Sequence, residues 1–174
     1  DIGHGYASLL VRYDPLTCDA DALARELTRR AASLSGRPEA KPRSFQIPVR
    51  YGGVTGPDLL EVARSVGLSE EEFVEAHAGA SYDVRFIGFS PGFPYLAGLP
   101  ERLQTPRRSA PRALVPAGSV AVAGAQATIY PVRSPGGWNI IGHTEFVLFD
   151  PTGAHAATLA AGDRVTFRAL DDRQ

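Results

Sequence analysis

The chain has 174 residues, 44% of them hydrophobic, which is enough apolar material to bury a core in one domain or in a domain with a smaller companion. Its formal net charge of -1 gives no electrostatic basis for binding nucleic acid or an anionic membrane, and we expect neither as a partner. A single cysteine, Cys18, excludes an intrachain disulfide and a multi-cysteine metal site, so we expect a reducing, cytoplasmic location.

The first part of the chain predicts a small α/β unit. Tyr6 to Tyr13 is short, apolar and β-rich, and Asp14-Pro15 closes it as a turn would, so it predicts a strand. Apolar residues recur at helical spacing from Ala20 to Leu34 and predict an amphipathic helix. The polar, proline-bearing stretch from Gly36 to Arg43 has the composition of a linker. We therefore expect a small domain over residues 1–43, truncated at its N-terminal side because a strand begins so early.

Two helices are predicted after a strand from Ser44 to Tyr51. Pro57 at a first-turn position opens a helix that extends through Val66. Ser69, with Glu72 three residues later, forms a capping-box signature and predicts a second helix that ends at Gly79. The two helices are expected to pack against each other as a hairpin.

The rest of the chain predicts short strands. A strand from Tyr82 to Phe89 is followed by a long loop rich in proline and glycine that extends to about Ala117. Short strands separated by glycine-bearing turns are typical of an all-β barrel or sandwich. The predicted strands are Ser119 to Ala123, Ala127 to Tyr130, Trp138 to Ile141, Phe146 to Phe149 and Arg164 to Arg168.

The predicted helix pair, Asp58 to His77, has the spacing of a DNA-binding helix-turn-helix motif. Its second helix carries four glutamates between residues 70 and 75, which would face phosphates with like charge. A packed helical hairpin is therefore the better interpretation. His77 either complements the negative end of its helix dipole or belongs to a site.

Several catalytic patterns are excluded by particular residues. The phosphate-loop pattern GxxxxGK[ST] is absent, and the only lysine, Lys41, lies in the predicted linker. Gly88 to Gly92 resembles a nucleophile elbow around Ser90, but Pro91 lacks the backbone N–H that an oxyanion hole uses. The four histidines show neither HxH nor HExxH spacing, so we expect no metal site. We assign no catalytic residue.

Two segments combine aromatic residues with glycine and proline: Phe89 to Leu96 and Ser134 to Trp138. Such segments let the backbone approach a ligand while rigid rings wall a cavity, although they equally suit tight barrel corners with aromatics in the core. Between them lies Arg107 to Arg112, a cluster of forked donors suited to carboxylate or phosphate, which a solvated loop face explains nearly as well.

Several motifs in a fixed order resemble one family. The motifs are Pro48 to Gly53, Gly56 to Leu59, Gly88 to Leu96, Pro106 to Arg108, Pro111-Arg112, Val115 to Val120, Ile129 to Pro131 and Ser134 to Trp138. They are similar to those of the family of the 5-oxoprolinase B subunit, or allophanate hydrolase subunit 1, which includes the KipI inhibitor of a sporulation histidine kinase. The resemblance covers essentially the whole chain.

The resemblance implies a mainly β fold with α-helices, in which a cyclophilin-like β-barrel over residues 44–174 follows the small α/β domain. It also implies a subunit, inactive alone, of an ATP-dependent 5-oxoprolinase that converts 5-oxo-L-proline to L-glutamate. The implied partners are a C subunit, similar to allophanate hydrolase subunit 2, and a third, A-type subunit, and ATP is used by the complex. The alternatives are a KipI-like inhibitor of a sensor histidine kinase and a component of a urea carboxylase or allophanate hydrolase system.

We expect a small-molecule site that is completed by a partner subunit. One position departs from the family pattern, because an Ile-Gly-Arg-Thr stretch is Ile141-Gly142-His143-Thr144 here. If this residue holds a substrate carboxylate, anion binding should weaken as the imidazole loses its proton. The expected substrate-binding residues are Phe89, Pro91, Gly92, Phe93, Tyr95, Arg112, Gln126, Tyr130, Gly136, Gly137, Trp138 and His143.

Overall fold

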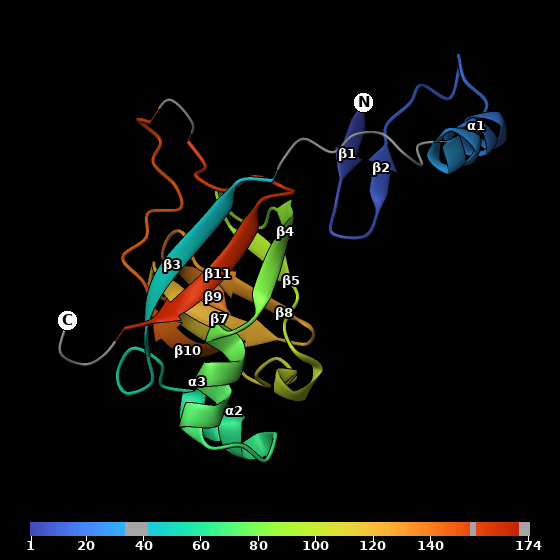
Figure 1. Cartoon of the computed structure of the whole chain (residues 1–174). Coiled ribbons are helices and arrows are strands. Elements are labelled where there is room, and N and C mark those ends of the chain that lie inside the picture. Colours follow the sequence, from blue (N-terminus) through green and yellow to red (C-terminus); the bar gives the residue numbers. More distant parts are fainter. Residues whose placement is uncertain (34–41, 154–155, 171–174) are drawn as a thin grey trace. The chain divides into compact units, whose positions relative to one another are not determined.

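The structure is a computed structural model that describes residues 1–33, 42–153 and 156–170. The chain divides into two units, Asp1–Pro42 and Arg43–Gln174, which we call the first unit and the barrel unit (Figure 1). Most of the predicted linker, from Gly36 to Lys41, and the predicted helix end at Leu34 lie outside the described residues.

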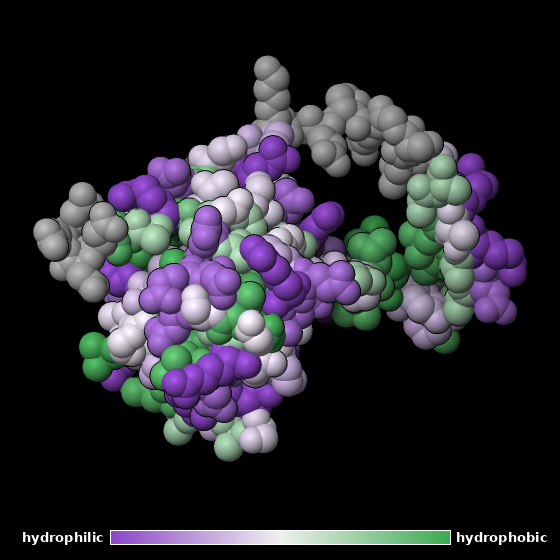
Figure 2. Space-filling model, turned by 60° about the horizontal axis from the view of Figure 1, so that its bottom comes forward, coloured by the Kyte–Doolittle hydropathy of each residue, from purple (hydrophilic) through white to green (hydrophobic). Residues whose placement is uncertain are grey.

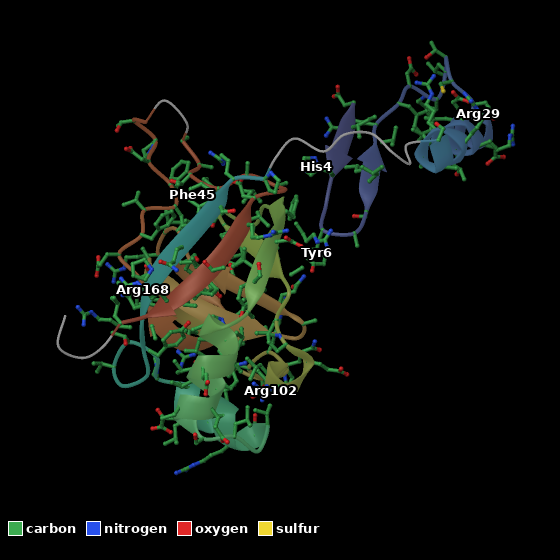
Figure 3. The ribbon with its side chains drawn as sticks, viewed as in Figure 1. His4, Tyr6, Arg29, Phe45, Arg102 and Arg168 are labelled. Atoms are coloured by element: carbon green, nitrogen blue, oxygen red, sulfur yellow. The ribbon has the colours of Figure 1, made fainter. Side chains whose placement is uncertain are left out.

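In its described residues, the first unit contains a two-stranded antiparallel sheet and one helix. The strands are β1 (Ile2–His4) and β2 (Leu9–Val11), and the helix is α1 (Ala20–Ser33); Figure 3 labels His4 and Arg29 on these elements. The predicted strand from Tyr6 to Tyr13 is therefore shorter than expected, and β1 was not predicted because an Ile-Gly-His run shows no alternation. No residue of α1 is buried.

Two short helices of the barrel unit are α2 (Leu59–Ser65) and α3 (Glu70–Ala78). The prediction that Pro57 occupies the first turn of α2 is wrong, because Asp58 is the N-cap residue and the helix begins after it. The capping box of α3 is confirmed: Glu72 N–H donates to Ser69 Oγ at 3.1 Å, and Ser69 N–H donates to the Glu72 carboxylate at 2.8 Å. Each bond satisfies a backbone donor that the first helical turn leaves unpaired.

The capping box gives the first stability prediction. Ser69→Ala leaves the Glu72 N–H without its acceptor, so we expect the free energy of unfolding to fall by about 1 kcal/mol. Urea denaturation measures this change, and Glu75→Ala, at an exposed position of the same helix, is the matched control. Equal midpoints for the two variants would show that the cap contributes nothing.

A closed barrel forms the centre of this unit. Every strand pairing in it is antiparallel except that of β3 with β11, which is parallel and runs from Ser44 beside Arg164 to Val49 beside Ala169. Phe45 on β3 and Arg168 on β11 mark this pair in Figure 3. Within the described residues, the barrel order is β10 (Asn139–His143), β3 (Ser44–Tyr51), β11 (Arg164–Ala169), β4 (Ser81–Ile87), β5 (Pro94–Ala97), β8 (Gln126–Ile129) and β7 (Ser119–Ala123), which returns to β10.

The expected mainly β fold with helices and a barrel is confirmed, but two local predictions are wrong. The predicted long loop before Ala117 contains β5, a 3-10 turn (Glu101–Leu103) and β6 (Arg112–Val115), and β6 pairs with β9 (Ser134–Gly136). The predicted strand from Phe146 to Phe149 forms only an isolated bridge. Its alternation reflects burial of Leu148 in the core rather than a ladder.

The buried side chains form two clusters. The larger joins the barrel strands to α2 and α3, and the smaller contains Phe93, Tyr130 and Trp138. Strand β7 is buried at every position because Val120 and Val122 face the larger cluster while Ala121 and Ala123 face the smaller one. The smaller cluster therefore packs on the face of β7 that is opposite to the larger cluster. The candidate site lies at this smaller cluster.

The helices α2 and α3 lie at one end of the barrel (Figure 1). Figure 2 brings this end forward and shows hydrophilic residues over much of it, with smaller hydrophobic areas between them. The inward faces of α2 and α3 bury Leu59, Val62, Phe73 and Ala76 against the core. The pair is thus packed as a helical hairpin.

Candidate functional site

A pocket with a volume of about 120 Å³ lies over the smaller cluster, and we call it the aromatic pocket. It is lined by five aromatic side chains, one guanidinium and the Pro-Gly-Gly run of the second aromatic segment. The lining residues are Phe89, Phe93, Tyr95, Arg107, Tyr130, Pro135, Gly136, Gly137 and Trp138. The structure thus brings together seven expected site residues: Phe89, Phe93, Tyr95, Tyr130, Gly136, Gly137 and Trp138.

The aromatic rings hold one another in place around Phe93. The Phe93 ring lies 5.2 Å from Tyr130 at 89° and 6.1 Å from Trp138 at 85°, both edge-to-face. Tyr95 contacts Phe93 at 5.1 Å and Trp138 at 6.1 Å. Edge-to-face pairs add about 0.5–1.5 kcal/mol each beyond the area that they bury, so the walls of the pocket are rigid.

The loop that carries Phe89 is strained. Phe89 has a φ of 68°, and Ser90 N–H donates to Gly88 C=O at 2.8 Å, so Phe89 is the central residue of a γ-turn with positive φ. The residue is 64% exposed, and its ring centre lies 5.2 Å from that of Phe93. Backbone strain of about 1–3 kcal/mol persists where surrounding contacts impose it, and it is typical of ligand sites.

Close packing requires glycine at two positions, Gly136 in the lining of the pocket and Gly92 in the loop before Phe93. A Cβ at Gly136 would lie 2.2 Å from the Tyr130 hydroxyl oxygen, and one at Gly92, whose φ is 77°, would lie 3.0 Å from the Leu148 carbonyl oxygen. Gly136 therefore sits directly on the Tyr130 hydroxyl. Burial raises the pKa of Tyr130, although the Trp138 backbone N–H and the Arg107 charge act in the opposite direction. Tyr130 stays protonated near neutral pH and can donate a hydrogen bond.

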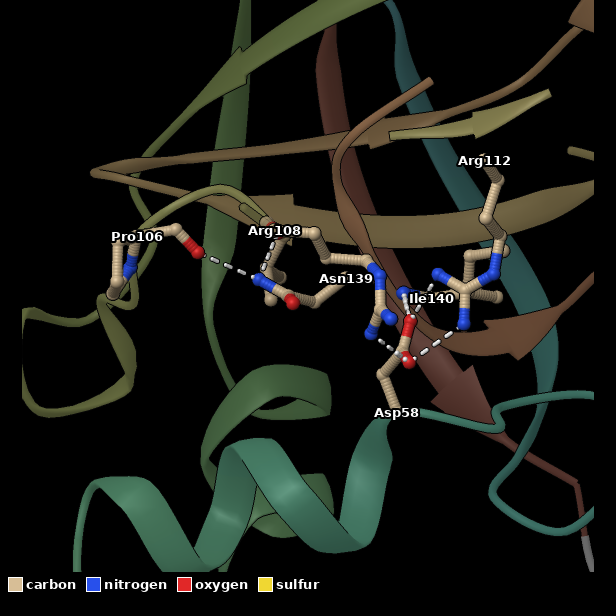
Figure 4. A network of polar contacts seen from close by, with 7 residues as sticks. Asp58, Pro106, Arg108, Arg112, Asn139 and Ile140 are labelled. Carbon is tan, nitrogen blue, oxygen red and sulfur yellow. Dashed lines mark hydrogen bonds and ion pairs between the residues drawn. The ribbon is translucent and has the colours of Figure 1, made fainter. Parts of the chain in front are cut away.

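The arginine cluster is divided between two tasks. Arg108 donates to Asp58 Oδ1 at 2.7 Å, and Arg112 donates to both Asp58 oxygens at 2.7 and 2.8 Å (Figure 4). The Ile140 N–H donates to the same carboxylate at 2.7 Å. Asp58 is 3% exposed, so this carboxylate joins the start of α2 to β6 and β10. Arg107 alone of the three lines the aromatic pocket.

The remaining expected residues lie elsewhere. The Arg112 guanidinium binds Asp58 and is not among the lining residues of the aromatic pocket. Gln126 begins β8 opposite Ala97. His143 ends β10, with its Nε2 3.1 Å from the Ala117 carbonyl oxygen, and lines a separate cavity of about 170 Å³. Pro91 and Gly92 precede Phe93 in its loop and are not among the lining residues of the aromatic pocket.

Asp58 is a residue that sequence reasoning missed. The sequence marks it only as the start of a helix, and a helix-capping aspartate is ordinary. Its side chain makes no cap bond, because the arginines and Ile140 take both carboxylate oxygens. The one available signal was the presence of the arginine cluster, but a sequence does not show which carboxylate meets it.

His77 is a buried core residue, and the helix-dipole interpretation of it is wrong. Its exposed fraction is 0%, its Nδ1 lies 2.8 Å from the Tyr51 hydroxyl, and its ring stacks on Phe167 at 4.7 Å. Burial lowers the pKa of His77 to about 3. The imidazole is therefore neutral and has no charge with which to complement the helix dipole.

A second cavity of about 450 Å³ lies between α2 and the segment 104–109, and Arg107 lines it as well. Among the described residues, no three His, Cys, Asp or Glu side chains gather in a way that could hold a metal ion. None of the helices in the described ranges has the length and apolar run that a membrane crossing requires. Cys18 is half-buried and lies in the first unit.

Comparison with curated proteins identifies clear relatives. The 5-oxoprolinase B subunit of Escherichia coli O157:H7 is 54% identical over 129 residues, which are 74% of this chain and 59% of that protein. The 5-oxoprolinase B subunit of Haemophilus influenzae is 44% identical over 162 residues, which are 93% of this chain and 72% of that protein. The chain thus spans well under the full length of these relatives.

Solved structures agree on the fold. A conserved uncharacterized protein from Pyrococcus horikoshii aligns with a TM-score of 0.72 and 41% identity over 99% of this chain and 79% of that one. The urea carboxylase of Kluyveromyces lactis aligns with a TM-score of 0.76 at 19% identity, over 98% of this chain and 18% of that one, and shows a shared fold alone. The family described as the carboxyltransferase domain, subdomains C and D, matches residues 1–159. The chain therefore belongs to this carboxyltransferase subdomain C and D family, together with the proteins named as 5-oxoprolinase B subunits.

Proposed function

We propose that this chain acts as the B subunit of an ATP-dependent 5-oxoprolinase, which hydrolyses the cyclic amide 5-oxo-L-proline to L-glutamate. The observation that carries the proposal is the aromatic pocket, because the two Gly/Pro/aromatic segments that resemble the family converge on it. The identity of 54% to a protein of that name supports the same assignment. The 19% identity to urea carboxylase carries the fold alone, so we propose no urea-directed activity.

The pocket suits binding and orientation rather than bond breaking. Hydrolysis breaks the ring C–N bond and adds water to the carbonyl carbon, and ATP used by the complex supplies the activation of the amide. Rigid rings exclude water and clamp a flat ring, and the Tyr130 hydroxyl can donate to a polar atom of it. No nucleophile is assigned to this chain. In this proposal, bond breaking takes place at a site that partner subunits of the C and A types complete. The complex acts in the cytoplasm.

The function test is reconstitution of the full-length protein with its partner subunits. Glutamate release from 5-oxoproline with ATP is expected to require this subunit. Wild-type activity from a complex that lacks it would overturn the proposal and would favour the KipI-like inhibitor interpretation instead.

Two pocket variants test the site. Tyr95→Ala removes a half-buried wall of the pocket, and Trp138→Phe shortens another wall while keeping an aromatic ring in the core. We expect each to lower kcat/KM of the reconstituted complex about tenfold, because about 1.4 kcal/mol of positioning energy is lost. Circular dichroism checks that the barrel remains folded. The control is Tyr13→Ala, which removes an exposed aromatic ring of the first unit. If both pocket variants had the kcat/KM of this control, Tyr95 and Trp138 would have a packing role only.

A further inference from the structure

Arg107 differs from its two neighbours in the arginine cluster. Arg108 and Arg112 both bind the buried Asp58 carboxylate. Arg107 is exposed, and among the described residues it forms no ion pair. Its guanidinium carbon lies 5.6 Å from the centre of the Trp138 ring, within cation–π distance. The fold thus pairs two of the arginines with Asp58 and leaves the third at the aromatic pocket.

The charge of Arg107 acts inside the pocket. It lowers the pKa of Tyr130, in opposition to the larger effect of burial, and the Arg112 charge acts in the same direction with a smaller effect. The lining residues of the aromatic pocket include no Asp or Glu, whereas the larger cavity beside α2 is lined by Glu61 together with Arg107 and Arg108. No lining carboxylate of the aromatic pocket therefore competes with an anionic ligand for the Arg107 guanidinium.

The geometry also favours a carboxylate. A guanidinium held against an indole ring loses little side-chain freedom on binding, and its planar fork matches a carboxylate with two parallel hydrogen bonds. The volume of the pocket, about 120 Å³, suits a molecule of amino-acid size. Aromatic walls suit the flat body of such a molecule, while the charged group stays at the rim.

We propose that Arg107 is the specificity-determining residue of the aromatic pocket, and that it binds the carboxylate of a small acid whose flat ring lies among the aromatic side chains. This inference deepens the proposed function and rests on it for the identity of the acid. In this proposal, the Arg107 side chain alone distinguishes a cyclic amide that carries a carboxylate from one that lacks it.

The test uses Trp138, the only tryptophan of the chain, as a fluorescent reporter inside the pocket. The purified full chain is titrated with 5-oxoproline, with pyrrolidin-2-one, which is the same ring without a carboxylate, and with inorganic phosphate. We expect saturable binding of 5-oxoproline, binding of pyrrolidin-2-one at least tenfold weaker, and no competition by phosphate at equal concentration. Midpoints are compared rather than intensities, because Arg107 itself contacts the reporter ring.

Variants then assign the effect to Arg107. Arg107→Gln should weaken 5-oxoproline binding at least tenfold and leave pyrrolidin-2-one binding unchanged, and Arg107→Lys should restore part of the loss. Arg102→Gln, an exposed arginine of the 3-10 turn that Figure 3 labels, is the matched control and should bind as the wild type does. In the reconstituted complex, Arg107→Gln should raise KM with little change in kcat.

The possible outcomes separate this proposal from the proposed function. No saturable response to 5-oxoproline, equal midpoints for Arg107→Gln and wild type, or effective competition by phosphate each overturns the carboxylate role. If the complex still needs this subunit for activity, the proposed function survives that failure. Conversely, binding that depends on Arg107, combined with full activity of a complex lacking this chain, keeps the carboxylate site and removes the 5-oxoprolinase assignment.

Discussion

Asp58→Ala is expected to lower the free energy of unfolding by about 3 kcal/mol. The substitution removes the carboxylate that accepts from Arg108, Arg112 and the Ile140 N–H, and it leaves two guanidinium groups and a buried N–H unpaired. The loss falls below the ~5 kcal/mol upper end for buried pairs because the arginine side chains are 25–30% exposed and can turn toward water. Trp138 fluorescence during urea denaturation measures the change.

The matched control for this variant is Asp83→Ala. Asp83 lies 3.8 Å from Arg85 and from Arg164, but its side chain is 49% exposed, so the loss should stay below about 1 kcal/mol. A second comparison replaces Asp58 by Leu and both arginines by Met, which removes the unpaired charges and should recover most of the stability. If Asp58→Ala and Asp83→Ala lowered the free energy of unfolding by similar amounts, the Asp58 network would contribute no more to stability than an exposed ion pair.

Acid is expected to destabilise the barrel unit through His77. Its pKa is about 3 in the folded chain against 6.5 ordinarily, so the unfolded chain binds a proton that the folded chain refuses. The contribution of His77 to the free energy of unfolding is fully present above pH ~6.5. It decreases by about 1.4 kcal/mol per pH unit as the pH falls toward ~3. Between pH 6.5 and pH 5 the expected loss is about 2 kcal/mol.

His77→Phe separates this effect from that of the carboxylates. Phenylalanine keeps the stack on Phe167 and removes the titrating group, although it also removes the contact with the Tyr51 hydroxyl. The variant should therefore lose less stability than the wild type over the same pH range, whatever its stability at pH 7. Parallel curves of unfolding free energy against pH for the two proteins would contradict the account.

The elements predicted correctly from the sequence are those with strong local signals. Strand β7 matches its prediction because Gly118 and Gly124, both at positive φ, bound an apolar run. The second helix was placed by its capping box. Strands β6 and β9 were missed because each has only three or four residues and β9 contains Pro135. They form because the fold brings them together, not because either segment prefers an extended state.

The candidate site was predicted in part for a similar reason. Aromatic residues mixed with glycine and proline indicate a rigid wall wherever they lie, so the residues of the aromatic pocket were recognisable. The role of each arginine depends instead on its distance from Asp58, which is 50 residues from Arg108 and 54 from Arg112 along the chain. Pairings at that separation are set by barrel topology, and the sequence alone assigned Arg112 rather than Arg107 to the site.

The parallel pairing of β3 with β11 has a consequence for synthesis of the protein. Each paired residue of β3 lies 120 positions before its partner in β11, as Ser44 does before Arg164. The barrel therefore cannot close during synthesis until β11, its last strand, has left the ribosome. Until then β3 and β4, the two neighbours of β11 in the barrel, each keep an open edge that other chains can pair with. Nascent copies of this protein are therefore expected to depend on chaperones more than a protein whose strands pair in sequence order.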